Sequence, residues 1–359
     1  MKMLLLGDVC PTDESNALFA AGDTAALFGG VKPLFDQADW SFVNLECAIT
    51  DSDNAIKKFG PNLKAPRLTA RILKELGVDC CGMSNNHIFD FGKEGALDTM
   101  RALQQEGIAY TGFGDNYDDS RRDLVVERDG QRIAIIAVCE HEYSYALDNR
   151  MGSRPYDVYD TVADVRRAKE QADRVVVLYH GGKEMCQYPS PRVRRLCRVL
   201  VDNGADVVLA QHSHCIATYE RYNGGHILHG QGNFHFSWGG WPEIWYSCLA
   251  ATYDTVTGEL ELTPLVIDGN AVRPANEQEA HKINDAFRQR NEELADGRWK
   301  DGWHRFCVSQ KYYLERLAPV CTPDATQEQN DLFGHYLDCE AHTDVYRELF
   351  PTYNQTNEL

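Results

Sequence analysis

Residues 191–215 read PRVRRLCRVLVDNGADVVLAQHSHC, a predicted helix that runs directly into a predicted strand. A proline stands at the start of the helix, apolar residues recur along it at helical spacing, and a glycine ends it. The apolar run at 206–211 has the length of a buried strand, and His212 and His214 follow it at once. This stretch therefore predicts an α/β fold in which one strand ends in two histidines.

The same alternation of strands and helices runs from residue 1 to about residue 270. Four further apolar runs are typical of buried strands: residues 3–7, 41–46, 78–84 and 174–180. Residues 66–77 and 93–107 are amphipathic and predict helices, and turns at Asp129-Gly130 and near Gly258 predict two hairpins. Parallel units mixed with hairpins predict two sheets packed face to face with helices outside, a layered α/β sandwich.

The remainder of the chain has a different composition. Residues 277–294 and 303–317 have helical patterns, and the segments around them are polar. We therefore predict two units, a main domain over residues 1–270 and a helical C-terminal extension over residues 271–359.

Composition limits the classes of function. The chain has 359 residues, of which 43% are hydrophobic and 25% charged, as in an ordinary globular protein. Its formal net charge of −18 argues against a general role on nucleic acid or on an anionic membrane. No apolar run approaches the roughly 20 residues needed to span a bilayer. The start MKMLLLGDVC lacks the features of a signal peptide, so we expect a cytoplasmic protein whose cysteines are reduced.

Polar residues follow the predicted strands at their carboxyl ends, where α/β proteins bind ligands. These residues are Asp8, Cys10, Asn44, Glu46, Asn85, Asn86, His87, Asp90, His180, Glu184, His212, His214, His229 and Asn233. Taken singly, each has a structural explanation, such as a capped turn, a buried histidine with a hydrogen-bond partner, or half of a salt bridge. Together they offer more imidazole and carboxylate ligands than one tetrahedral site uses. The set fits two adjacent transition-metal ions that share a bridging carboxylate.

The order of these motifs resembles the CapA family of poly-γ-glutamate capsule biosynthesis, a branch of the calcineurin-like metallophosphoesterase superfamily. The motifs stand here as GDVCP, NLECAIT, SNNHIFDFG, YHGGKEMCQYPSP, AQHSHCI and GQGNFHF, in unbroken order over roughly residues 3–240. The resemblance implies a four-layer α-β-β-α sandwich with a centre for two divalent ions such as Mn, Zn or Fe. It does not extend to the C-terminal extension.

Carried over position by position, the resemblance implies a set of ligands for each of the two ions. Asp8 and His214 would hold one ion, and Glu46 would bridge the two. The second ion would be held by Asn86, His180 and His212.

The chain departs from the superfamily pattern at two positions. Cys10 stands where the superfamily has a histidine, and Gln211 precedes His212 where glycine is usual. Cys10 is either a thiolate ligand or a small core residue that leaves its position to water, and we favour the second interpretation.

The implied activity is hydrolysis of a phosphoester or of a γ-glutamyl amide. His87 would be the general acid, Asp90 would orient His87 or cap the following helix, and Glu184 would bind the second nitrogen of His180. The partner would be a small anionic substrate or poly-γ-glutamate. The alternative is a protein that binds or assembles poly-γ-glutamate without turnover.

Two loops carry cations whose role the sequence leaves open. Residues 51–66 include Lys57 and Lys58, and residues 140–156 include Arg150 and Arg154 along with several tyrosines. These loops either recognise an anion or are simply solvated.

Overall fold

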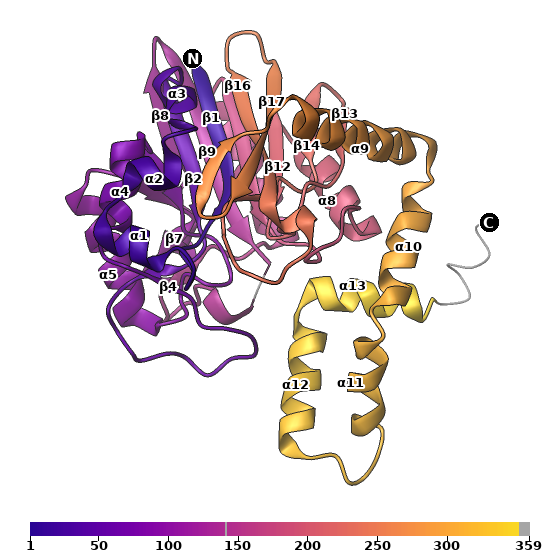
Figure 1. Ribbon diagram of the computed structural model, residues 1–359. Helices are drawn as coiled ribbons and strands as arrows, with labels where there is room; N and C mark the ends of the chain where they lie inside the picture. The colour runs from indigo at the N-terminus through magenta and orange to yellow at the C-terminus, as the bar shows by residue number, and fades with distance from the viewer. Residues whose placement is uncertain (141, 352–359) are drawn as a thin grey trace.

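The computed structural model describes residues 1–140 and 142–351, and its main body contains two large β-sheets (Figure 1). Residue 141 of the predicted loop 140–156 and residues 352–359 of the predicted extension lie outside the described residues. The strands of the eight-stranded sheet are β18 (Ala271–Pro274), β17 (Leu260–Asp268), β16 (Ser247–Asp254), β1 (Lys2–Val9), β2 (Trp40–Leu45), β5 (Cys80–Gly82) and β6 (Ala109–Thr111) in this order, with β15 (Asn233–His235) beside β1.

The second sheet has six strands. They are β13 (Tyr219–Tyr222), β14 (Gly225–Leu228), β12 (Val207–Gln211), β11 (Arg174–His180), β9 (Gln131–Cys139) and β8 (Leu124–Arg128) in this order. The central strands β14, β12, β11 and β9 are parallel, and so are β1, β2, β5 and β6 of the first sheet. Two short pairs stand apart, β3 (Ala48–Ile49) with β4 (Lys64–Ala65) and β7 (Phe113–Gly114) with β10 (Gly152–Ser153).

The two sheets pack face to face because their strands are apolar on both faces. On β1, Met3 and Leu5 enter the core between the sheets, whereas Leu4 enters a core on the outer side. On β11, Val176 faces the other sheet and Val177 faces outward. Successive side chains of a strand point to opposite faces, so a strand buried on both sides needs a continuous apolar run.

Helices cover both outer faces and complete four layers. The first sheet is covered by α1 (Asn16–Ala21), α2 (Thr24–Phe28), α3 (Lys32–Asp36), α4 (Thr69–Leu76) and α5 (Gly92–Gln105). The second sheet is covered by α7 (Val158–Gln171) and α8 (Pro191–Asp202). The short helices α6 (Tyr117–Ser120), η1 (Glu142–Ser144) and η2 (Glu243–Tyr246) lie in connections. The predicted four-layer α-β-β-α sandwich is thus confirmed.

The C-terminal region is helical, as predicted, but its elements differ in detail. Its helices are α9 (Glu277–Asp296), α10 (Trp299–Ser309), α11 (Tyr312–Val320), α12 (Gln327–Asp338) and α13 (Glu340–Leu349). The pattern at 303–317 is divided between α10 and α11, and the polar residues after it form two further helices. The first sheet continues past residue 270, because β18 pairs with β17. The division into two domains stays a prediction.

The C-terminal helices have a hydrophobic core of their own, and an ion pair ties them to the main body. Trp303 and Tyr313 pack with Val345 in this core, together with Cys186 from the loop after β11. Arg192 at the start of α8 places its Nε 2.9 Å from a carboxylate oxygen of Asp344 in α13. The yellow helices α11 and α12 lie side by side below the main body in Figure 1. Of the described helices, none is long and apolar enough to span a membrane.

Candidate metal centre and cavity

Strands from both sheets end at one place, and the Glu46 carboxylate lies at its centre. Glu46 follows β2 of the first sheet, whereas His180 and His212 stand at the ends of β11 and β12 of the second. Its Oε1 is 3.3 Å from Nε2 of His180, 3.9 Å from Nδ1 of His212 and 3.9 Å from Nε2 of His214. One carboxylate oxygen therefore faces three imidazole rings.

The surroundings of Glu46 fit a metal ion. The side chain is completely buried, and neither carboxylate oxygen has a hydrogen-bond partner among the described residues. Burial raises the pKa of Glu46, as expected for a carboxylate that has lost its water. A buried carboxylate without protein donors is costly unless a cation compensates it.

Two groups of side chains are spaced closely enough to hold an ion. One consists of Glu46, His212 and His214, and the other of Asp8, Glu46 and His180. Glu46 belongs to both groups, which fits its predicted bridging role. The imidazole and carboxylate donors suit Zn, Mn or Fe. The groups cut across the predicted division of ligands between the two ions, so that division stays a prediction.

Asp8 is fixed on the first sheet by neighbouring donors. Its Oδ1 accepts a hydrogen bond of 2.8 Å from Asn44 Nδ2, and its Oδ2 accepts one of 3.1 Å from the backbone N–H of His212. The same carboxylate lies 3.7 Å from His180 Nδ1 and 3.6 Å from His214 Nδ1. Burial, together with the negative charge of Glu46, raises the pKa of Asp8 to about 6.

His180 is oriented by asparagines on both of its nitrogens. Asn44 Nδ2 lies 3.1 Å from its Nδ1, and Asn86 Oδ1 lies 2.9 Å from its Nε2. Burial lowers the pKa of His180 to about 4, so the ring is neutral at neutral pH, which is the form that binds metal. Glu184, predicted to bind His180, places Oε1 3.9 Å from Nε2 of His212.

His212 and His214 both adopt a left-handed backbone conformation, with φ values of 82° and 53°. Residues with side chains rarely adopt this conformation, and when they do they cluster at functional sites. The turn aims both rings at Glu46. His214 Nδ1 lies 2.9 Å from Asn233 Oδ1. The side-chain nitrogen of Asn233 in turn donates a hydrogen bond to the backbone oxygen of Trp245.

Two other residues that follow predicted strands, His229 and Cys10, have their contacts with residues outside the two ligand groups. His229 is not at the centre: its Nδ1 lies 3.0 Å from Thr218 Oγ1 and its Nε2 lies 3.6 Å from Glu220. The strand β14 ends at Leu228, and the side chain of His229 contacts the segment at the start of β13 and not Glu46. Cys10 is fully buried, with its Sγ 3.4 Å from the backbone oxygen of Pro11.

His87 lies beside the centre in a buried cluster with Asp90 and Lys58, and burial lowers the pKa of its ring. Its Nδ1 is 2.7 Å from Asp90 Oδ2 and 3.1 Å from Lys58 Nζ, and Lys58 also forms an ion pair with Asp90. Asp90 additionally accepts a hydrogen bond of 2.7 Å from the backbone N–H of Leu63. Since Nδ1 is engaged, Nε2 is the nitrogen available to a ligand. Lys58 thus has a partner inside the protein and is not a solvated loop lysine.

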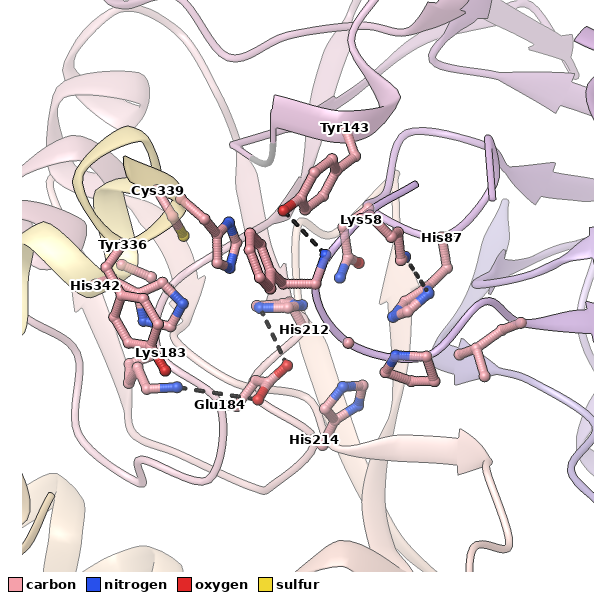
Figure 2. A pocket seen from close by; sticks show the side chains of 18 of the residues that line it. Lys58, His87, Tyr143, Lys183, Glu184, His212, His214, Tyr336, Cys339 and His342 are labelled. Atoms are coloured by element: carbon pink, nitrogen blue, oxygen red, sulfur yellow. Dashed lines mark hydrogen bonds and ion pairs between the residues drawn. The ribbon is translucent and has the colours of Figure 1, made fainter. Parts of the chain in front are cut away.

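A cavity of about 580 Å³ opens over the centre (Figure 2). Asn86, His87, His212 and His214 line its floor. Figure 2 shows Lys58 and His87 on one side of the two histidines and Lys183 with Tyr336 and His342 on the other. The side walls include the aromatic residues Phe59, Tyr143, Phe236, Trp238, Trp241 and Trp245.

The C-terminal helices form one wall of this cavity, which the sequence did not indicate. Their lining residues are Arg316, Glu328, Leu332, His335, Tyr336, Cys339, Ala341 and His342. The ring of His335 in α12 stacks on Phe59 at 5.5 Å and on Tyr143 at 5.3 Å between ring centroids. Both partners belong to the two predicted cation-bearing loops. These loops therefore hold the C-terminal wall in place.

The chain is similar to proteins of capsule synthesis. The model of the family described as "Bacterial capsule synthesis protein PGA_cap" matches residues 2–237. The capsule biosynthesis protein CapA of Bacillus anthracis is 27% identical over 331 residues, which cover 88% of this chain and 80% of that protein. The PGA biosynthesis protein CapA of Bacillus subtilis strain 168 is 29% identical over 250 residues, or 67% of this chain and 65% of that protein.

A solved structure of a 5'-nucleotidase precursor from Thermus thermophilus has a TM-score of 0.39 and 16% identity, covering 80% of this chain and 58% of that chain. The span matched by the family model contains every predicted metal ligand and His87, and it ends before the C-terminal helices begin.

Proposed function

The chain belongs to the family of bacterial capsule synthesis proteins, PGA_cap, and from this premise we propose that it is a metal-dependent hydrolase with a centre for two ions. Its substrate in this proposal is a phosphoester or a γ-glutamyl amide in the synthesis or processing of poly-γ-glutamate. The curated relatives named for capsule and PGA biosynthesis support this direction.

The observation that carries the proposal is the environment of Glu46. A carboxylate that is fully buried, lacks protein hydrogen-bond donors and faces three imidazoles is unfavourable without a cation. Its membership in both ligand groups supports a bridging role. The ions would be held by Asp8, Glu46, Asn86, His180, His212 and His214.

Divalent ions bound there would make water acidic enough to supply hydroxide near neutral pH and would neutralise charge on a phosphoryl or carbonyl oxygen. His87 acts as general acid in this proposal and donates a proton from Nε2 to the leaving group. Asp90 accepts a hydrogen bond from Nδ1 and is itself paired with Lys58, which holds the ring so that Nε2 faces the substrate. Asn44 and Asn233 orient His180 and His214.

Metal analysis combined with a substrate screen tests the proposal. Purified protein should take up close to two Mn or Zn ions per chain and should hydrolyse a member of one of three groups: phosphomonoesters, phosphodiesters or γ-glutamyl peptides. His212→Ala should lose metal and activity. The matched control is His281→Ala, because the His281 side chain is 79% exposed on α9.

Two outcomes would contradict the proposal. A protein that takes up neither ion has no metal centre of the proposed kind. A protein that holds the ions and binds oligo-γ-glutamate but cleaves no substrate would instead be the binding or assembly protein of the alternative hypothesis.

A further inference from the structure

Lys183 is a buried cation on the cavity wall, and its ammonium group forms no hydrogen bond with the residues that the structure describes. It follows β11 by three residues, and its side chain is only 7% exposed. The nearest carboxylate oxygen, Oε2 of Glu184, is 3.9 Å from its Nζ, which is beyond hydrogen-bond distance. An ammonium group has three N–H donors. The donors of Lys183 are therefore open to a ligand in the cavity.

The charge of Lys183 is retained despite its burial. Burial by itself lowers the pKa of a lysine, but the Glu184 carboxylate and further neighbouring groups together keep the pKa of Lys183 above its ordinary value. A buried ammonium held at a distance from its nearest carboxylate is costly, and an anionic ligand in direct contact would offset that cost.

The position of Lys183 relative to the metal centre defines where such an anion would lie. Glu184 stands between the two, because its Oε1 is 3.9 Å from His212 Nε2 while its Oε2 faces Lys183. In Figure 2 Lys183 lies on the opposite side of His212 from His87. An anion at Lys183 would therefore belong to a part of the substrate remote from the leaving group that His87 protonates.

The C-terminal helices enclose this side of the cavity. Tyr336 and His342 stack on each other at 4.4 Å between centroids and lie beside Lys183 in Figure 2. Arg316 from α11 adds a second cation to the cavity lining. The wall thus combines two cations and one carboxylate, that of Glu328, with a stacked aromatic pair, and its cations suit a carboxylate ligand better than a neutral group.

We propose that Lys183 forms a subsite that binds a carboxylate of the substrate other than the group undergoing hydrolysis. This inference rests on the proposed function and narrows its substrate to a molecule with a free carboxylate beyond the scissile bond. A γ-linked glutamyl chain meets this requirement, because every residue of such a chain retains its α-carboxylate.

Binding of a γ-linked glutamate trimer, measured by isothermal titration calorimetry on the full chain loaded with Mn, tests the subsite. Lys183→Gln removes the charge but keeps a polar side chain, and it should weaken binding by about 10- to 100-fold, the usual range for one charge-assisted hydrogen bond. Lys183→Arg should retain most of the affinity. The control is Lys57→Gln, since Lys57 is exposed and lies outside the cavity lining.

The wild-type protein should also bind the trimer with all carboxylates amidated at least tenfold more weakly than the acidic trimer. Equal binding of the two trimers, or unchanged binding by Lys183→Gln, would overturn the subsite. Should Lys183→Gln fail to fold by circular dichroism, Lys183→Met and the amidated trimer provide the same comparison.

Mass spectrometry of the same samples detects cleavage of the trimer, so the subsite and the proposed hydrolase activity are tested separately. Lys183-dependent binding without cleavage supports the subsite and contradicts the hydrolase. Hydrolysis that is indifferent to Lys183 and to the carboxylates supports the hydrolase and overturns the subsite.

Discussion

Glu46 and His180 come from different sheets, yet Glu46 Oε1 lies 3.3 Å from His180 Nε2. Glu46 follows β2 of the first sheet, and His180 ends β11 of the second. The candidate metal centre therefore lies where the two sheets of the sandwich meet. The packing of the apolar faces between the sheets fixes its geometry, because residues such as Leu5 and Leu178 set how closely the strand ends approach.

Replacing Glu46 with glutamine should reduce bound metal from close to two ions per chain to one or none. Glutamine keeps the shape of the side chain but removes the negative charge shared by the two ligand groups. Elemental analysis after incubation with Mn or Zn measures the change. The matched control is Glu259→Gln at an exposed turn position. Unchanged metal content in Glu46→Gln would contradict the bridging role.

The variant His87→Ala should retain its metal and lose about 10²- to 10⁴-fold in the rate of hydrolysis of substrates with poor leaving groups. A nitrophenyl substrate should lose much less, because its leaving group needs little protonation. Rates on the two substrates and metal content, measured on the same preparation, check this. An equal loss on both substrates, or loss of metal, would argue against a general acid.

Cys10→Ser should leave the number and preference of bound ions unchanged. The thiol is fully buried, and burial holds the pKa of Cys10 well above its ordinary value, which disfavours the thiolate that binds metal. Elemental analysis and X-ray absorption of the wild-type protein provide the measurement. A sulfur–metal signal, or loss of one ion in the variant, would make Cys10 a ligand.

The variant His335→Ala should loosen the C-terminal wall. The ring of His335 stacks on both Phe59 and Tyr143, and each aromatic pair contributes about 0.5–1.5 kcal/mol beyond its buried area. Limited proteolysis within α12 should accelerate by roughly 2- to 10-fold, because cleavage follows the population of the open form. His281→Ala on α9 is the control. If His335→Ala and the wild-type protein are cleaved within α12 at the same rate, His335 does not hold the C-terminal wall in place.

The sequence predicted the parts of the site that depend on local patterns. A strand end can be recognised in a sequence because an apolar run stops there. Since parallel strands present ligands at their carboxyl ends, the polar residues that follow such a run are candidate ligands. Asp8, Glu46, His180 and His212 were predicted in this way, and the structure brings their side chains together around Glu46. His229 also follows a strand, but its side chain contacts Thr218 and Glu220 and not Glu46.

The C-terminal wall was not predictable from local patterns. No residue of α12 is buried, so the sequence of this helix resembles a polar segment without a core-facing stripe. Its position depends on contacts with residues distant in the chain, such as the stacking of His335 on Phe59. Lys183 was missed for the same reason, because its neighbours in the cavity include Tyr336 and His342, which are distant in the chain.

The cavity is assembled from two parts of the chain. Its floor lies within residues 2–237, which the family model matches, whereas one wall comes from α11, α12 and α13 beyond that span. A small hydrophobic core of their own supports these helices. Substitutions in the wall can therefore change the shape of the cavity while leaving the candidate metal ligands untouched. The floor of the cavity and this wall can therefore change independently in sequence, because they belong to different parts of the chain.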